Sequence, residues 1–223
     1  MSAAARFPRP LGIVCGLRSE KRSLVGWYGA EGVEIAISGA RPDRATEHAE
    51  RMVADGCRAL LSVGFAGGLD PGLRAGDLFA GSEVVTAEGE RLPLALPPCP
   101  APRTLRIFGS DRLVRRIADK EALFAASGAP AVDMETHRVA RVARTAGIPA
   151  YALRAICDPA TRELPGFLET AVDETGTPRL FTILGGLLLN PGRIGTLIAL
   201  GQDQTAARKA LAGWARSAAA SGG

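Results

Sequence analysis

The sequence predicts a three-layer α/β/α fold, in which helices cover both faces of a central sheet, followed by a C-terminal helical appendage. Short apolar runs alternate with segments of helical periodicity over the first 159 of the 223 residues, a pattern typical of α/β proteins. Hydrophobic residues make up 47% of the chain, which is ordinary for a globular protein, and the length suits one domain with a sizeable core. Beyond Pro159 the alternation stops, and this marks where the appendage begins.

Several apolar runs are expected to form the strands of the sheet. The first, LGIVCG, is too short for the apolar core of a secretory leader and is better interpreted as a strand. Another, ALLSVGFAGG, is expected to be a buried strand that leads into a glycine loop. The expected strands span 11–16, 33–38, 59–68, 77–87, 104–109, 129–134 and 149–157.

Three segments are expected to form the helices between these strands. Residues 42–55 carry an apolar stripe at helical spacing, and Gly56 is suited to the C-cap. Residues 111–127 are expected to form the second helix. Residues 135–146 are expected to form the third helix, with Val139, Val142, Ala143 and Ala146 facing inward.

Two further segments interrupt or follow this pattern. The proline-rich stretch LPLALPPCPAP, at 92–102, is expected to be a surface loop. Residues 160–223 are expected to pack as a helical segment on the core formed by 1–159. Their most apolar part, 180–201, contains a proline and an arginine and falls short of the roughly 20 apolar residues of a membrane span. This part can line an apolar exit or rest on a membrane, or it can be ordinary helix packing or a subunit interface.

Charge and cysteine content argue against several classes of protein. The formal net charge is +4, but the basic residues are scattered among acidic ones, so no nucleic-acid partner is expected. The four cysteines lie far apart without a CxxC pair, and the chain has two histidines. Neither a disulfide scaffold nor a metal site is therefore expected, and the composition favours a reduced, cytoplasmic protein.

Carboxylates follow three of the expected strands. Glu20 comes just past the first strand at an expected helix start, and Asp133 and Glu135 flank a methionine at a strand–helix seam. Asp158 ends the last strand, and Pro159 disfavours helical backbone for this residue. Ligands of α/β sheets bind outside the carboxyl ends of the strands. Carboxylates from three separate regions are therefore expected to share one cleft.

Each of these features also has a plain structural interpretation. Glu20 can be a solvated charge in the first turn of a helix, where the macrodipole favours it. Asp133 or Glu135 can cap the helix that follows. The glycine loop can simply turn the chain, since it does not match the GxGxxG dinucleotide motif. Asp158 before proline is a common turn pair, so local chemistry alone leaves the function open.

Three motifs, in this order along the chain, resemble the nucleoside phosphorylase and nucleosidase superfamily: SVGFAGGLDPGLRAGDL, AVDMET and LRAICDPA. This superfamily includes methylthioadenosine/S-adenosylhomocysteine nucleosidases and purine nucleoside phosphorylases. The resemblance runs from about Leu11 to Pro159 and implies a central mixed sheet in a single domain. The segment LPGFLETAVDETG and the following LLLNPGRIGTLIALGQD are similar to the hopanoid-associated branch, which removes adenine from adenosylhopane during bacteriohopanepolyol synthesis.

The resemblance implies a role for each of the singled-out residues. Asp158 is the implied general acid, which protonates purine N7 so that adenine leaves neutral. Glu135 is the implied ligand of the ribose hydroxyls, and Met134 packs under the sugar. Glu20 corresponds to the glutamate that helps activate water in nucleosidases. The implied substrate-binding part of the glycine loop consists of Phe65, Ala66 and Gly67.

The sequence analysis also predicts structural roles for three residues and a position for one segment. Asp133 is expected to order the strand–helix seam. Phe65 can be core packing or an apolar wall near the ribose. Cys157 is expected to pack beside the acid. The segment GSDRLV is expected near the base, and the sequence does not identify which side chain stacks on the adenine.

The acceptor of the sugar stays open. Phosphorylases of this superfamily carry a phosphate-binding arginine at the place of Glu20, and arginine and serine around the glycine loop. This chain has Ser62 and Phe65 there, and this favours hydrolysis. The hopanoid-associated branch is nevertheless described as phosphorylases, and Arg18 and Arg22 beside Glu20 could supply positive charge or be solvated. Phosphate is therefore retained as an alternative co-substrate.

The expected function is cleavage of the N-glycosidic bond of an adenosyl compound, with adenosylhopane as the preferred substrate. Soluble methylthioadenosine or S-adenosylhomocysteine is the alternative substrate, and a non-catalytic nucleoside-binding protein is the alternative class. No metal or organic cofactor is implied. A small-molecule, lipid-linked partner and a homo-oligomer are expected, with location in the cytoplasm or peripherally at the inner membrane surface.

Overall fold

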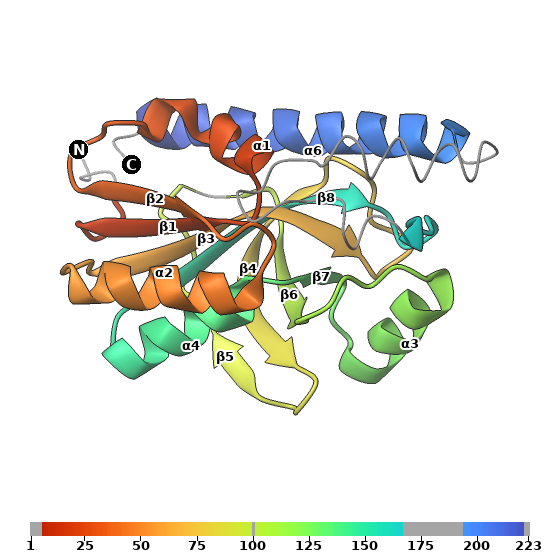
Figure 1. The fold of residues 1–223 in the computed structure, drawn as a ribbon, viewed down its shortest axis with the longest axis horizontal. Coiled ribbons are helices and arrows are strands. Elements are labelled where there is room, and N and C mark those ends of the chain that lie inside the picture. Colours follow the sequence, from red (N-terminus) through yellow and green to blue (C-terminus); the bar gives the residue numbers. More distant parts are fainter. Residues whose placement is uncertain (1–5, 100, 167–193, 221–223) are drawn as a thin grey trace.

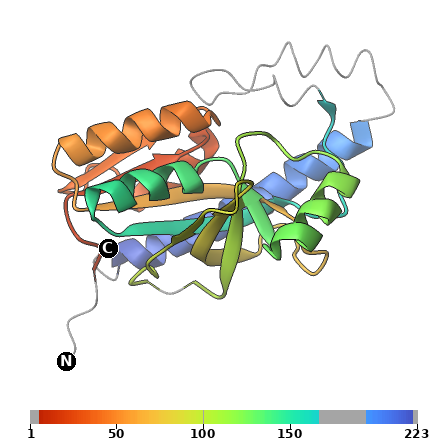
Figure 2. The same cartoon turned by 90° about the horizontal axis from the view of Figure 1, so that it is seen from below.

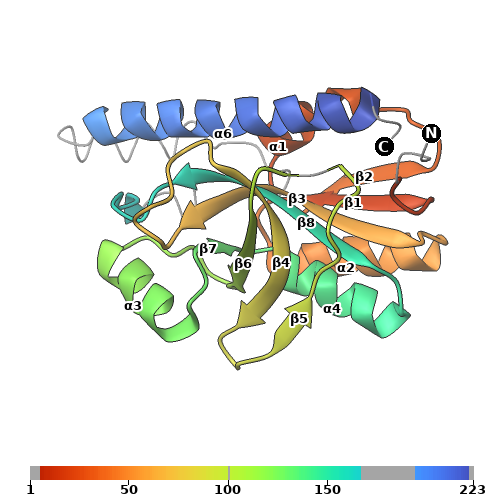
Figure 3. The same ribbon diagram turned by 180° about the vertical axis from the view of Figure 1, so that it is seen from behind.

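The computed structural model describes residues 6–99, 101–166 and 194–220, and its core is one sheet of eight strands. The strand order is β2-β1-β3-β7-β6-β4-β5, and β8 pairs with both β3 and β4. Figures 1 and 3 show this sheet from opposite sides. The strands are β1 (Leu11–Cys15), β2 (Val33–Ile37), β3 (Ala59–Gly68), β4 (Leu78–Thr86), β5 (Arg91–Pro93), β6 (Thr104–Gly109), β7 (Ala131–Asp133) and β8 (Ala150–Asp158).

The sheet is mixed, as the resemblance implies. β1 is parallel to β2 and β3, and β3 is parallel to β8. β7 runs antiparallel to β3 but parallel to β6, and β4 runs antiparallel to β8. The carboxyl ends of β1, β3 and β8 therefore lie at the same edge of the sheet.

Helices cover both faces of the sheet, which confirms the expected three layers. One face carries α1, η1 and α6, and the other carries α2 and α4, which lie side by side (Figures 1 and 2). The helices are α1 (Arg18–Lys21), the 3₁₀ helix η1 (Arg22–Trp27), α2 (Pro42–Ala54), α3 (Ile117–Ser127), α4 (Thr136–Ala146) and α6 (Ile194–Ala220).

The strand β3 contributes side chains to the apolar clusters on both faces of the sheet. Successive side chains of a strand point to opposite faces of the sheet. Accordingly, Leu60 belongs to the apolar cluster that contains residues of α2 and α4, whereas Leu61 and Val63 belong to the cluster under α6. Both faces are buried, which is why the strand is a nearly continuous apolar run in the sequence.

Aromatic contacts hold α6 against the rest of the protein. Trp214 of α6 stacks on Trp27 of η1 with ring centroids 6.1 Å apart and an interplanar angle of 11°. The Trp27 indole donates a hydrogen bond of 3.0 Å to the carbonyl of Ala215, and Phe7 meets both indole rings edge-on. Within the helical segment expected over 160–223, the structure describes α6, which runs from Ile194 to Ala220.

Three expectations for local structure are wrong. Ala146, expected to face inward, is exposed in the last turn of α4. The proline-rich stretch at 92–102 is not irregular throughout, because its start forms β5, which pairs antiparallel with β4. Pro93 is tolerated there because β5 is an edge strand. The helix expected from residue 111 starts only at Ile117, since Ser110 accepts the N–H of Arg112 in a local turn.

Among the described residues, no helix combines the length and hydropathy needed to cross a membrane. Most of the apolar stretch at 180–201, including 180–193, lies outside the described residues. Its last part is the beginning of α6, where Ile198 is 59% exposed.

Candidate active site

Two of the carboxylates that follow strands, Glu20 and Glu135, lie beside each other, and Asp158 lies at the end of β3. Gly16 follows β1, and a Cβ placed on it would lie 2.7 Å from Oε1 of Glu135 and 3.2 Å from Oε2 of Glu20. A Cβ on Gly67, near the end of β3, would lie 3.1 Å from Oδ2 of Asp158. Glu20 follows β1, Glu135 follows β7 and Asp158 ends β8, and all three are buried.

Glu20 is held by backbone donors from two segments. Its Oε2 accepts the N–H of Leu17 at 2.7 Å, and its Oε1 accepts the N–H of Phe65 at 2.7 Å. Burial raises the pKa of Glu20, opposed by these donors, by the Arg154 charge and by the N–H of Gly16. Since Glu20 is only 4% exposed, its interpretation as a solvated helix charge is wrong.

Arg154 of β8 is the central cation of this site, and the sequence interpretation missed it. Its guanidinium is fully buried, donates from Nε to Asp133, and donates from Nη2 to Ser62 Oγ at 2.5 Å and to Thr136 Oγ1 at 2.9 Å. Nη2 also lies 3.8 Å from Oε2 of Glu135. The arginine within the apolar run YALRAIC was the available signal, because a charge on a buried strand requires partners.

Asp133 orders the strand–helix seam, as expected. Its Oδ1 accepts the N–H of Thr136 at 3.1 Å, which satisfies a free donor in the first turn of α4. Its Oδ2 accepts the Thr136 hydroxyl and the Arg154 guanidinium. Of the two acids that could cap α4, Asp133 is the one whose side chain does so.

Glu135 occupies the position before α4 and is buried beside other acids. Burial raises its pKa to about 8, and the charges of Glu20 and Asp133 add to the rise while Arg154 opposes it. This carboxyl is therefore a group whose proton is lost near neutral to mildly alkaline pH.

Glu135→Gln is expected to flatten the pH dependence of stability. The folded protein holds the Glu135 proton more tightly than an unfolded chain does, because its pKa is about 8 rather than 4.5. The free energy of unfolding should therefore fall as pH rises between these values, by at most about 1.4 kcal/mol per pH unit. Denaturant unfolding across this range should give a smaller slope for the variant.

Glu83→Gln is the control for that measurement. The pKa of Glu83 is lowered by its hydrogen bond from Arg91, so its proton is already lost over this range. This control should keep the wild-type slope. An unchanged slope in Glu135→Gln would contradict the assignment.

Asp158 is bound by a buried lysine that the sequence interpretation also missed. Lys120 of α3 is fully buried, and its Nζ donates to Asp158 Oδ2 at 2.7 Å and to the carbonyls of Pro159 and Arg162, each at 3.1 Å. Burial raises the pKa of Asp158, and Lys120 opposes that rise. Nothing in the helical segment ADKEALF distinguishes this lysine from a solvated one.

The residue before the acid packs as expected. Cys157 donates its thiol to Asp158 Oδ1 at 3.2 Å, and burial raises the pKa of the thiol well above its usual range. A thiol that stays protonated is a poor nucleophile, so the geometry gives Cys157 a packing role.

The glycine loop is the end of β3, and it changes register beside the acid. The pairing of β3 with β8 shifts between Ala66 and Gly67, which places Gly67 opposite Asp158. Such irregularities redirect side chains at functional sites. The Phe65 side chain packs in the cluster under α6, and its backbone N–H donates a hydrogen bond to Glu20. Met134 is half-buried between Asp133 and Glu135.

Gly64→Ala is expected to disturb both acid and arginine. A Cβ there would lie 2.7 Å from Oε1 of Glu20 and 2.9 Å from Nη1 of Arg154. Crowding of a packed interior costs about 1–3 kcal/mol. Gly213→Ala is the matched control, because a Cβ there meets nothing within 4 Å and alanine favours the helix. Thermal unfolding should show a lower midpoint for Gly64→Ala and no loss for Gly213→Ala.

Within residues 6–99, 101–166 and 194–220, no group of three or more His, Cys, Asp or Glu side chains could hold a metal ion. The buried cations beside the carboxylates are Arg154 and Lys120.

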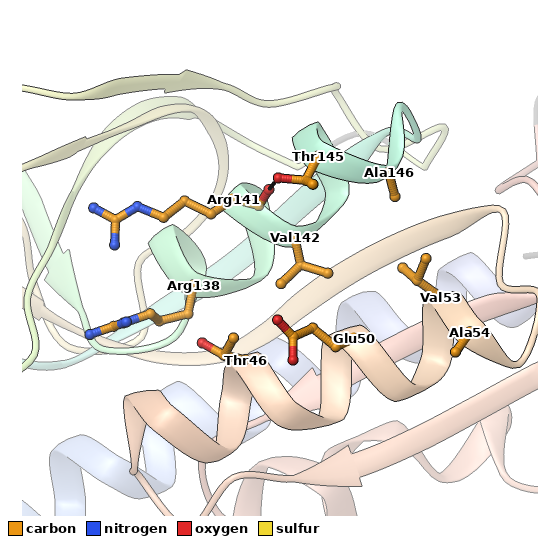
Figure 4. A pocket seen from close by; sticks show the side chains of 9 residues that line it. All are labelled: Thr46, Glu50, Val53, Ala54, Arg138, Arg141, Val142, Thr145 and Ala146. Carbon is orange, nitrogen blue, oxygen red and sulfur yellow. Dashed lines mark hydrogen bonds between the residues drawn. The ribbon is translucent and has the colours of Figure 1, made fainter.

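A separate groove lies between α2 and α4, with a volume of about 470 Å³ (Figure 4). Val53 and Val142 contribute apolar surface to it, whereas Glu50 and Arg138 contribute charge. None of the three site carboxylates lines this groove. It is therefore distinct from the candidate active site.

Comparison with known families and structures agrees with this fold. The model of the phosphorylase superfamily matches residues 103–184, a stretch that includes Lys120, Glu135, Arg154 and Asp158. No curated protein matches the chain.

Solved structures share the fold at low sequence identity. The Neisseria meningitidis 5'-methylthioadenosine/S-adenosylhomocysteine nucleosidase in complex with methylthio-immucillin-A is 16% identical with a TM-score of 0.70, covering 95% of this chain and 98% of that one. The Helicobacter pylori nucleosidase with butyl-thio-DADMe-Immucillin-A is 21% identical with a TM-score of 0.63, covering 82% and 100%. Futalosine hydrolase of H. pylori is 21% identical with a TM-score of 0.58, covering 66% and 87%.

Proposed function

Because residues 103–184 match the phosphorylase superfamily and the fold is that of its nucleosidases, we propose that this chain cleaves the N-glycosidic bond of an adenosyl compound and releases adenine. One observation carries the proposal. Three buried carboxylates, Glu20, Glu135 and Asp158, follow β1, β7 and β8, and each has a different set of partners. Differently tuned carboxylates in one site are typical of acid–base chemistry.

Asp158 is the general acid in this proposal. Burial raises its pKa, which favours a carboxyl that still carries a proton to give. The proton passes to N7 of the adenine while the bond from the ribose to N9 breaks, and the bonding electrons leave with the base. The Asp158 carboxylate formed in this step is stabilised by Lys120, whose ammonium is already 2.7 Å away.

Glu135 holds the ribose hydroxyls in this proposal. A carboxylate beside the ribose stabilises the positive charge that develops on the sugar as the base departs. Met134 packs under the sugar, and the backbone of Phe65, Ala66 and Gly67 lines the site at the end of β3. Arg154, 3.8 Å from Glu135, supports the ionised form of that carboxylate.

Glu20 is the proposed activator of the water that attacks the sugar. Its two oxygens are fixed by the N–H groups of Leu17 and Phe65, so the carboxylate is oriented before substrate binds. The buried guanidinium of Arg154 already donates hydrogen bonds to Asp133, Ser62 and Thr136. The site carries no other buried arginine among the described residues, which favours water over phosphate as the acceptor.

The preferred substrate is adenosylhopane, on the strength of the tail that is similar to the hopanoid-associated branch. A second candidate is methylthioadenosine or S-adenosylhomocysteine. It is supported by the match of 95% of the chain to the fold of the N. meningitidis nucleosidase.

The deciding experiment measures adenine release from adenosylhopane in detergent and from methylthioadenosine, each with and without phosphate. The sugar product is identified by mass. Phosphate-independent release giving ribosylhopane supports the proposal, and loss of that release in Glu20→Gln supports the role of Glu20. Release that requires phosphate would make the enzyme a phosphorylase, and tight binding of both substrates without release would overturn the enzyme assignment.

A homo-oligomer is part of this proposal, with the α2–α4 groove as the contact. The groove pairs apolar surface from Val53 and Val142 with Glu50 on one helix and Arg138 on the other (Figure 4). A two-fold axis through such a surface would bring the acid of one copy to the cation of the other. Light scattering should give a dimer mass for the wild type and a monomer mass for Val142→Glu.

All four cysteines are free, which suits the proposed cytoplasmic location.

A further inference from the structure

A second pocket, of about 220 Å³, lies where η1 meets α6, and its lining is strongly basic. Four of its six lining residues are cations, and no carboxylate lines it. The residues are Arg22, Ser23, Arg208, Lys209, Ala212 and Arg216. We use the name η1–α6 face for these six residues together with the exposed side chains of Val25, Tyr28 and Ile198.

The four cations lack the partners that other surface arginines have. Within the described parts of the chain, none of them forms an ion pair. Elsewhere the surface pairs its charges: Arg91 and Arg106 bind Glu83, and Arg141 and Arg144 bind Glu90. Unpaired like charges in one pocket repel one another, and an anion placed there would relieve that repulsion.

Exposed apolar side chains lie on the same two elements. Four large hydrophobic residues are exposed among the described residues, and three of them belong to η1, its C-cap or α6. Val25 is 67% exposed, Tyr28 44% and Ile198 59%. A small soluble anion would gain nothing from these side chains, whereas a lipid surface offers phosphate groups and an apolar layer together.

Helical geometry aligns these residues along α6. Ile198, Lys209 and Arg216 are spaced by about three and five whole turns, so they lie along one line of the helix. That line faces away from the sheet, because Ala207, Leu211 and Ala218 on the opposite side are buried. Figure 1 shows α6 running along one whole side of the molecule, with α1 and η1 beside it.

We infer that the η1–α6 face binds the anionic surface of a lipid membrane. Its four cations contact headgroup phosphates, and Val25 and Ile198 enter the interface shallowly. The face adjoins the candidate active site, since Arg22 lies two residues beyond Glu20. The inference deepens the proposed function, because a lipid-linked adenosyl substrate would be reached from such a surface.

The test is sedimentation of the full chain with vesicles, without substrate. Binding to phosphatidylcholine vesicles that contain phosphatidylglycerol should exceed binding to phosphatidylcholine alone and should weaken as salt rises. Lys209→Glu with Arg216→Glu should lower the partition coefficient at least tenfold. Reversal of Arg58 and Arg144, exposed arginines on other parts of the surface with the same change in net charge, should leave binding near the wild-type value.

Three outcomes would overturn the inference. These are equal binding to both vesicle types, equal loss in the two double variants, or complete displacement by inorganic phosphate at constant ionic strength, which would indicate a site for a free anion. Adenine release from adenosylhopane in detergent and from methylthioadenosine is measured in parallel and should be unchanged in Lys209→Glu with Arg216→Glu. Failure of the wild type to release adenine from both adenosylhopane and methylthioadenosine would count against the proposed function and leave the vesicle result intact.

Discussion

Asp158→Asn lowers the rate of adenine release by about 10²–10⁴-fold, the usual cost of losing one general acid. The amide has the shape of the acid but no transferable proton, and it can still receive a hydrogen bond from Lys120, now 2.7 Å from Oδ2. Substrate binding should therefore be retained while turnover is lost. Single-turnover measurement of adenine release, together with binding of an adenosyl ligand, separates the two effects. Near-wild-type turnover would remove Asp158 from the mechanism.

Lys120→Met tests how that proton is held. Burial raises the pKa of Asp158 and Lys120 opposes the rise, so removal of the ammonium should raise this pKa further. The alkaline limb of the rate against pH should move to higher pH, because the acid keeps its proton longer. The rate at its maximum should also fall, since the carboxylate formed during the reaction loses its stabilising partner. An unmoved alkaline limb would show that another group controls it.

Arg154→Met should give the largest loss of stability, about 3–5 kcal/mol, because it leaves buried carboxylates without their cation. Asp133 would lose an ion pair, and Glu135 and Glu20 would lose the positive charge that opposes the rise of their pKa values. The loss should grow as pH rises, since these acids then lose protons that the folded state holds more tightly.

Urea unfolding at several pH values checks this prediction. Arg58→Met, at an exposed position, is the control and should stay within about 0.5 kcal/mol of the wild type. If Arg154→Met matched this control, the guanidinium would not be the partner that makes burial of three acids tolerable.

The parts of the fold that the sequence predicts are those with a strong local signal. Alternating apolar runs and helical stripes locate the long strands and α2 and α4, because each element buries a face of its own. The sequence did not predict β5, because this edge strand has only three residues, including Pro93, and shows almost no alternation of apolar and polar residues. The start of α3 was misplaced because a side-chain turn at Ser110 competes with the helix.

The candidate site divides in the same way. The sequence could predict Glu20, Glu135 and Asp158, because each acid is recognised from its own position after a predicted strand. Their cations could not, since Lys120 reaches Asp158 across 38 residues and Arg154 reaches Ser62 across 92. Such pairs exist only once the chain has folded. Arg154 was nevertheless detectable in principle, because it interrupts a strand that must be buried on both faces.

The stacked indoles under α6 have a spectroscopic consequence. The chain has two tryptophans, Trp27 and Trp214, and both lie in this one contact. Intrinsic fluorescence of the whole protein is therefore a local signal that reports whether α6 is seated on η1, while far-ultraviolet circular dichroism reports on all helices and strands. If the two signals change together in denaturant, α6 is released only when the sheet unfolds. If fluorescence changes first, the long helix is a separately detachable layer.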